Sequence, residues 1–409
     1  MQSSTHPPRR RRAVMLALAT LAAATVTVTA GTASADAGPS DEPAAKGPAA
    51  VHGQRGKLLG VRPLSGTAAL PSAARNLLVT YVSEDGKGKR IAVSGTVSLP
   101  KKRPPAGGWP VISWAHGTTG TADACAPSAD TATGLVHDYL SLMDKTRDAW
   151  VARGFAVVQT DYEGLGTPGE HPYMNGRSAA NTVLDMVRAA RNVDHRVGKG
   201  WFAIGHSQGG HAALFSAAAE NTRKDVKLLG AVAIAPGGVG LSQTAPYIQA
   251  GGPGAQAALA FLPTLLIGAS AADPAVVPDA LLTAEAKPLL TAGRTSCLAQ
   301  IREVAATIPV NNVFAPGADL GPLTRYLQTQ DPTGIAVRVP TLVAQGTDDA
   351  LVPKQTTDHL ISTMCAKAKK VSYKVYSGAD HRAAVAASFD DALNFVNTVR
   401  SGGTPATTC

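Results

Sequence analysis

The residues with the clearest chemical potential are a serine, an aspartate and a histidine that follow one another along the chain. Ser207 lies in the sequence GHSQG at residues 205–209, between an apolar run and a stretch of small residues. A strand, the pattern G-x-S-x-G and a helix together form a nucleophile elbow. The turn is so tight that side chains at the two glycine positions would collide with backbone. This pattern predicts that Ser207 is a nucleophile.

The two partners of a serine nucleophile are expected downstream, each after a predicted strand. Residues 339–345 read as a buried strand that precedes Asp348 and Asp349, and residues 371–376 as another that precedes His381. The spacing G-x-x-D-x-x-V-P selects Asp349, so that Asp348 caps the turn or is solvated. His381 would take the serine proton, and Asp349 would hold the imidazole tautomer and stabilise the imidazolium. The order Ser, Asp, His is that of α/β-hydrolases, and we predict a triad of Ser207, Asp349 and His381.

An oxyanion hole is expected upstream of the nucleophile. Residues 109–115 read as a central strand that leads into HGTTG at residues 116–120. Such a loop supplies one backbone N–H, and the residue after the nucleophile, Gln208, supplies the other. Loss of one such donor costs about 3 kcal/mol of transition-state stabilisation. We assign the loop donor to Thr118, with a residue up to Gly120 as the alternative.

Other polar motifs point to no further chemistry. His206 is the variable residue of the elbow, and His211 lies in the helix behind it, where a packing role is expected. The chain has no H-E-x-x-H, C-x-x-C or clustered carboxylate pattern, so no metal is predicted. The glycine-rich residues 164–166 and 237–240 complete neither a dinucleotide fingerprint nor a P-loop, so no cofactor is predicted either.

Apolar strand patterns alternate with helical patterns over most of the chain, which predicts an α/β-hydrolase fold: a mostly parallel sheet with helices on both faces. Ser178 is the expected N-cap of one helix. The core is predicted in two parts, residues 61–240 and 336–409. The expected strands are 76–82, 91–99, 111–115, 155–160, 202–204 and 229–235, and the expected helices are 139–153, 178–197 and 208–221.

Residues 241–335 interrupt this alternation with short apolar stretches separated by prolines. A segment of this length is too long for a loop, and we expect a mainly helical cap over the site. The run at residues 257–267 is too short for a membrane span and contains Pro263. It is expected either as a buried helix of the cap or as the lining of an acyl pocket, with transient contact to a lipid interface.

The first 35 residues read as a signal peptide. Four arginines, Arg9 to Arg12, precede an apolar stretch and an A-x-A site, which predicts cleavage after Ala35 and secretion. Residues 36–60 are expected to form a flexible mature N-terminus. Because residues 1–35 hold four arginines and no acidic residue, cleavage lowers the net charge from +9 to +5. After cleavage, no basic run suited to nucleic acid remains.

Four cysteines remain in the mature chain. An even number in an exported protein favours disulfides over free thiols or a metal site. Three pairings are possible, and the local option would tie down the C-terminus. The cysteines are Cys125, Cys297, Cys365 and Cys409.

Over nearly the whole mature length, the chain resembles the secretory lipase family, the lipase-A-like branch of α/β-hydrolases. The motifs that carry the resemblance are residues 116–120, 125–128, 161–166 and 184–191, together with the elbow and the two downstream loops. It implies a triacylglycerol lipase or carboxylesterase with a cap that shapes an acyl tunnel. The expected substrate is an ester or lipid, and nothing in the sequence implies a protein partner. The resemblance also implies the disulfides Cys125–Cys297 and Cys365–Cys409.

Two alternatives to a lipase remain open. A secreted peptidase or acyltransferase would use the same triad on the same fold. A non-catalytic binding protein would be expected to have lost part of the triad or elbow, and neither is broken. Asp161 and Glu163 are interpreted as structural carboxylates beside the site.

Overall fold

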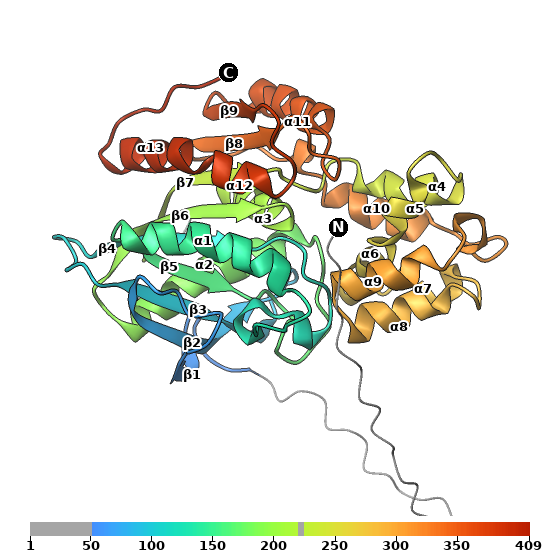
Figure 1. Cartoon of the computed structure of the whole chain (residues 1–409), viewed down its shortest axis with the longest axis horizontal. Helices are drawn as coiled ribbons and strands as arrows, with labels where there is room; N and C mark the ends of the chain where they lie inside the picture. Colours follow the sequence, from blue (N-terminus) through green and yellow to red (C-terminus); the bar gives the residue numbers. More distant parts are fainter. Residues whose placement is uncertain (1–50, 220–224) are drawn as a thin grey trace, which may run out of the picture. The chain divides into compact units, whose positions relative to one another are not determined.

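A nine-stranded sheet, with strand order β1-β2-β3-β5-β4-β6-β7-β8-β9, runs through the protein (Figure 1). The computed structural model describes residues 51–219 and 225–409. β1, β2, β3 and β5 are joined by antiparallel pairing. From β5 onward, through β4, β6, β7 and β8 to β9, each neighbouring pair is parallel. The strands are β1 (Leu58–Pro63), β2 (Ala73–Glu84), β3 (Arg90–Pro100), β4 (Trp109–Ala115), β5 (Ala156–Thr160), β6 (Val197–His206), β7 (Lys227–Ile234), β8 (Thr341–Gly346) and β9 (Val371–Tyr376).

Helices cover both faces of this sheet. One face packs against α2, α3 and α11, and the other against α1, α12 and α13. Strands β5 and β8 are buried along their whole length, as expected for parallel strands covered on both sides. The covering helices are α1 (His137–Ala152), α2 (Gly176–Val193), α3 (Gln208–Ala218), α11 (Lys354–Lys367), α12 (Ala383–Ala387) and α13 (Phe389–Arg400).

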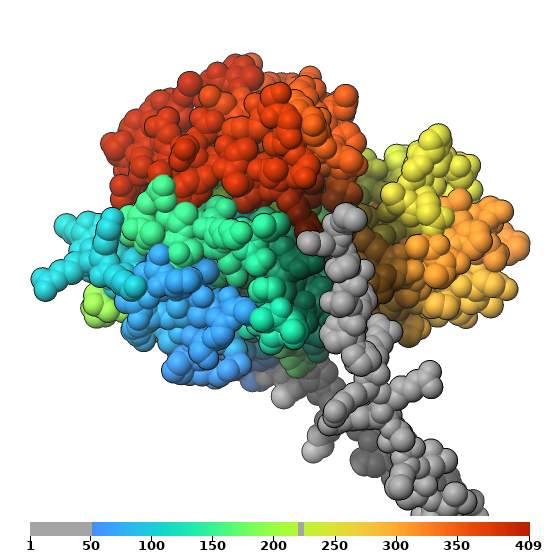
Figure 2. Space-filling view, in the orientation of Figure 1, coloured from blue at the N-terminus to red at the C-terminus, as the bar shows by residue number. Residues whose placement is uncertain are grey.

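Seven short α-helices, with three single-turn 3-10 helices between or beside them, fill the chain between β7 and β8 and form an insertion with its own apolar core. In the space-filling view, the residues of this insertion form a lobe of their own, coloured yellow to orange (Figure 2). Four of its prolines stand in the first turn of a helix, where a missing N–H costs nothing, so these start helices rather than break them: Pro263, Pro278, Pro288 and Pro322. The helices are α4 (Thr244–Gln249), α5 (Ala255–Leu259), α6 (Leu262–Ala272), α7 (Pro278–Leu281), α8 (Lys287–Thr295), α9 (Leu298–Ala306) and α10 (Gly321–Thr329).

The apolar run at residues 257–267 is divided between α5 and α6, and α6 is buried over most of its length. None of the helices in the described ranges 51–219 and 225–409 is long and apolar enough to cross a membrane. The predicted signal peptide, residues 1–35, lies outside the described residues, as do residues 36–50 of the predicted flexible segment.

Two local predictions were wrong. Residues 58–60 were expected to be flexible, but they begin β1, which pairs with β2. Ser178 is not the N-cap of α2: the helix begins two residues earlier, and the side chain of Asn175 caps it by accepting from the Ser178 N–H at 2.9 Å. The Ser178 hydroxyl donates instead to Glu163.

Two disulfides join segments that are distant in sequence. Cys125, in the loop after β4, is bonded to Cys297 at the start of α9, and this bond ties the insertion to the core. Cys365 of α11 is bonded to Cys409 at the C-terminus. These pairs are the ones that the family resemblance implies, and they account for all four cysteines.

A buried carboxylate joins the N-terminal strands to α2. Asp185, whose side chain is 0% exposed, accepts from Arg55 at 2.7 Å and from Arg188 at 2.7 Å. The Ser83 hydroxyl donates to the same carboxylate at 2.7 Å. Because Arg55 precedes β1, Ser83 belongs to β2 and Asp185 to α2, this cluster fixes the antiparallel edge of the sheet against the helix.

The Asp185 cluster gives a prediction for stability. In Asp185→Asn the side chain keeps its shape but loses its charge, which leaves two guanidiniums without their shared counter-ion. We expect the free energy of unfolding to fall by roughly 3 kcal/mol, measured by urea denaturation. The matched control is Asp225→Asn, which removes another partner of Arg188 but one whose side chain is 54% exposed. Its expected cost is below about 1 kcal/mol, and an equal loss in both variants would contradict the assignment.

Candidate active site

The predicted nucleophile lies at the turn between β6 and α3 in a strained backbone conformation. Ser207 has φ 59° and ψ −117°, a left-handed φ that a serine rarely adopts. The Ser207 N–H donates to Ile234 O at 2.9 Å, and its C=O accepts from Gly237 at 3.1 Å and from His211 at 3.1 Å. These bonds to the end of β7 and to α3 hold the turn in place.

The two glycines of the elbow are required by close backbone approach. A Cβ on Gly205 would lie 2.1 Å from the carbonyl oxygen of Gly209, and one on Gly209 would lie 1.9 Å from the carbonyl oxygen of Ala115. Both distances are far below van der Waals contact, and both neighbours are backbone atoms that cannot rotate away. The G-x-S-x-G spacing is therefore dictated by the packing of α3 against β4.

The loops after β8 and β9 bring the predicted acid and base together. The His381 Nδ1–H donates to Asp349 Oδ2 at 2.8 Å. The other carboxylate oxygen accepts the N–H groups of Leu351 and Val352 at 2.9 and 2.8 Å, so the acid is oriented by backbone. Burial alone would raise the pKa of Asp349, but the bonds from His381 and from its other donors hold that pKa below its usual value.

The competing aspartate faces elsewhere. Asp348 is exposed, and its carboxylate accepts from the Thr347 hydroxyl at 2.7 Å. Because His381 donates its Nδ1 proton to Asp349, its Nε2 is left as the acceptor nitrogen. Ser207 and His381 both line the same cavities.

The two predicted oxyanion donors, Thr118 and Gln208, line the larger cavity together with Ser207. Within the described residues, the backbone N–H groups of Thr118 and Gln208 donate to no acceptor. The preceding loop amide, that of Gly117, is already used because it donates to the Tyr139 hydroxyl at 2.8 Å. The Thr118 hydroxyl is bonded to the Tyr173 hydroxyl at 2.8 Å, which anchors the loop.

A buried histidine that the sequence analysis passed over holds the Gln208 side chain. The His171 Nδ1–H donates to the carbonyl oxygen of Glu163 at 2.7 Å, so its Nε2 accepts from the Gln208 amide at 3.0 Å. Burial lowers the pKa of His171 to about 4, which keeps this ring neutral and able to accept. His171 follows no strand, so no sequence pattern marked it.

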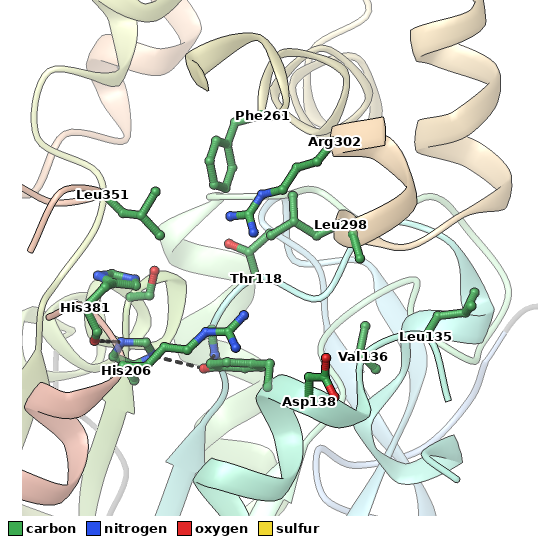
Figure 3. A pocket seen from close by; sticks show the side chains of 15 residues that line it. Thr118, Leu135, Val136, Asp138, His206, Phe261, Leu298, Arg302, Leu351 and His381 are labelled. Carbon is green, nitrogen blue, oxygen red and sulfur yellow. Dashed lines mark hydrogen bonds between the residues drawn. The ribbon is translucent and has the colours of Figure 1, made fainter. Parts of the chain in front are cut away.

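His206, expected to be only the variable residue of the elbow, links helix α1 to the loop that carries His381 (Figure 3). Its Nε2–H donates to the carbonyl oxygen of His381 at 2.8 Å, and its Nδ1 accepts from the Tyr139 hydroxyl at 2.9 Å. Since Tyr139 accepts from Gly117, a chain of three hydrogen bonds runs from the predicted oxyanion loop to the backbone of the predicted base. Burial, followed by the nearby His381, lowers the pKa of His206 to about 3.

Asp161 and Glu163 have structural partners. The Asp161 carboxylate accepts from the Ser94 hydroxyl at 2.7 Å and from the Ser128 N–H at 2.9 Å, and burial raises its pKa. Glu163 accepts from Ser178 at the start of α2, and burial raises its pKa to about 7. Among residues 51–219 and 225–409, no group of three or more His, Cys, Asp or Glu side chains could hold a metal ion.

Two cavities meet at Ser207 and His381. The larger, of about 470 Å³, extends beneath the insertion and is lined by apolar and uncharged polar residues apart from His381. The smaller, of about 120 Å³, opens toward α1 and α9 (Figure 3). Thr118, Phe261 and Leu351 line both.

Comparison with known proteins gives a family match. The profile of the secretory lipase family matches residues 147–408. Lipase A of Moesziomyces aphidis is 26% identical over 362 residues, which cover 82% of this chain and 74% of that protein.

Solved structures show the same fold. Candida antarctica lipase A superposes with a TM-score of 0.72 at 23% identity, over 87% of this chain and 84% of that one. A rice cell wall degrading esterase, LipA from Xanthomonas oryzae, superposes with a TM-score of 0.63 at 20% identity, over 85% and 98% of the two chains. Both likenesses agree with the predicted α/β-hydrolase architecture.

The bridging role of His206 predicts its protonation state. Because its pKa is lowered to about 3, the ring should stay neutral, with the proton on Nε2, between about pH 4 and 8. Long-range ¹H–¹⁵N spectra of the histidine-labelled protein measure this, and the signal is assigned by its loss in His206→Asn. In Tyr139→Phe the Nδ1 shift should change, since its donor is gone, while Nε2 keeps its proton. A His206 titration midpoint near 6.5 would contradict the bridge.

Proposed function

The chain belongs to the secretory lipase family, and on that premise we propose that it hydrolyses carboxylic esters of acyl lipids, as a triacylglycerol lipase or carboxylesterase. The observation that supports this most is the His381–Asp349 hydrogen bond of 2.8 Å beside Ser207, at the mouth of an uncharged cavity. The reaction proposed is acyl transfer to Ser207 and then to water.

In the first step, His381 Nε2 takes the Ser207 hydroxyl proton as the serine Oγ bonds to the ester carbonyl carbon. The electron pair of the carbonyl double bond moves to its oxygen, and the N–H groups of Thr118 and Gln208 donate to that oxyanion. Asp349 stabilises the imidazolium without taking its proton. Neither N–H donates to another group within the described residues, which supports this assignment. Donors that are already free and in place need no rearrangement as charge develops on the oxygen.

In the second step, the bond between the carbonyl carbon and the alcohol oxygen breaks, and the imidazolium of His381 gives its proton to that oxygen. The alcohol leaves and the acyl group remains on Ser207. Water then repeats the sequence, with His381 as base and then as acid, and the carboxylic acid is released.

The larger cavity supports an acyl substrate rather than a peptide. No Asp, Glu, Lys or Arg side chain lines it, and it includes apolar side chains of the insertion such as Leu241, Phe261 and Leu265. A peptidase that binds a free amine would need a carboxylate there, and Glu285 and Glu303 do not line this cavity. An acyltransferase remains the second candidate, because the same acyl-enzyme can react with an alcohol in place of water.

The proposal includes export from the cell, with the leader removed after Ala35. Two disulfides support an oxidising compartment, since such bonds are rare in the reducing cytosol. Insertion residues around the larger cavity are also proposed to contact a lipid interface transiently. Tyr247 of α4, which lines this cavity and is 42% exposed, supports that contact.

Hydrolysis of p-nitrophenyl esters of increasing acyl length tests the proposal. Each buried methylene contributes about 0.8 kcal/mol, so kcat/KM should rise about fourfold per methylene until the cavity is filled. Release of free acid rather than transfer to an added alcohol distinguishes a hydrolase from an acyltransferase. A profile that peaks at acetate and falls with length would contradict the lipase assignment.

The same assay distinguishes the two neighbouring aspartates. Asp349→Asn should lower kcat by about 10⁴-fold, because an amide cannot hold the required histidine tautomer or stabilise its charge. Asp348→Asn is the matched control, one residue away and exposed, and it should keep most of the activity. A large loss in the control alone would transfer the role of the acid to Asp348.

A further inference from the structure

The smaller cavity beside the proposed nucleophile is lined by charged side chains, whereas no Asp, Glu, Lys or Arg lines the larger cavity. Arg302 of α9 and Arg382, the residue after His381, both line it together with Ser207. Figure 3 shows Arg302 directed into the cavity from the insertion, on the opposite side from His206. The two arginines thus belong to different parts of the fold, the insertion and the core, and both line this cavity.

Aromatic rings support both guanidiniums. The Arg302 guanidinium lies 5.7 Å from the Phe261 ring centroid, and that of Arg382 lies 5.7 Å from the Tyr139 ring centroid. Neither forms an ion pair with a carboxylate in the described ranges, 51–219 and 225–409. Burial and the charge of Arg382 lower the pKa of Arg302, so the two cations repel each other. The one acidic residue that lines the cavity, Asp138, is exposed and pairs with neither.

The chemistry proposed above indicates which part of a substrate this cavity would hold. The uncharged larger cavity suits the acyl chain. The alcohol must leave beside His381, because that residue protonates its oxygen, and Arg382 is the next residue in the chain. A volume of about 120 Å³ accommodates only a small group.

We propose that the smaller cavity binds an anionic group, a carboxylate or a phosphate, on the alcohol part of the ester. This inference rests on the proposed ester hydrolysis. A guanidinium presents paired N–H donors that match the oxygens of either anion. An anion between Arg302 and Arg382 would also neutralise their mutual repulsion, which a neutral alcohol cannot do.

Matched substrate pairs test the proposal. The carboxylate arm compares the hexanoyl ester of glycolate with that of glycolamide, and the phosphate arm compares hexanoyl 2-hydroxyethyl phosphate with its neutral dimethyl phosphate ester. For at least one arm, kcat/KM should favour the anion by about 10-fold or more at low salt, since hydrogen bonds between charged partners are strong. The arm that shows the preference identifies the anion.

Arg302→Gln and Arg382→Gln should each lower this anion-to-neutral ratio by about 10-fold or bring it close to one. Arg325→Gln is the matched control, an exposed arginine of the insertion that does not line the cavity, and its ratio should equal that of the wild type. Because Arg382 is exposed, Arg382→Gln should fold, and it tests the proposal even if Arg302→Gln does not fold.

Each outcome has one meaning. Hydrolysis of the neutral esters with no anion preference in either arm would overturn the anion site and leave the proposed function standing. A preference that survives in both arginine variants would also overturn it. Failure to hydrolyse any of the esters would contradict the proposed function itself.

Discussion

The site depends on one constraint, the strained turn that carries Ser207. The serine holds a φ of 59° because β6 must end and α3 must begin within a single residue, with α3 packed against the end of β4. Glycine is needed at positions 205 and 209 for the same reason. The cost of this backbone conformation, of order 1–3 kcal/mol, is offset by the hydrogen bonds of the turn and by the buried parallel strands around it.

Because strands β4, β6, β8 and the neighbouring β9 are parallel, their carboxyl ends share one edge of the sheet. The proposed oxyanion loop, nucleophile, acid and base each follow one of these ends. Neutral buried histidines then hold these segments and the neighbouring helices together: His206 connects Tyr139 of α1 to the backbone of His381, and His171 holds Gln208 of α3. Burial lowers the pKa of both rings, so they serve as fixed donors and acceptors, and the proposed mechanism assigns the proton transfers to His381 instead.

The sequence analysis anticipated the features that local patterns encode. Short runs of residues are enough to identify the elbow and the alternation of strands and helices. They also show the order of Ser207, Asp349 and His381 along the chain. The start of β1 and the cap of α2 were missed, because a partner strand and the Asn175 side chain decided them. Likewise, the contacts of His206 arise only in the folded chain: its partner Tyr139 is 67 residues away and His381 is 175 residues away.

The central claim is that Ser207 carries the acyl group, and covalent trapping tests it most directly. The protein is treated with a fluorophosphonate, digested and mapped by mass spectrometry. One adduct is expected, on the peptide that contains Ser207, and Ser207→Ala should take up none while its fold, followed by circular dichroism, is unchanged. An adduct on another residue, or labelling that persists in Ser207→Ala, would contradict the account.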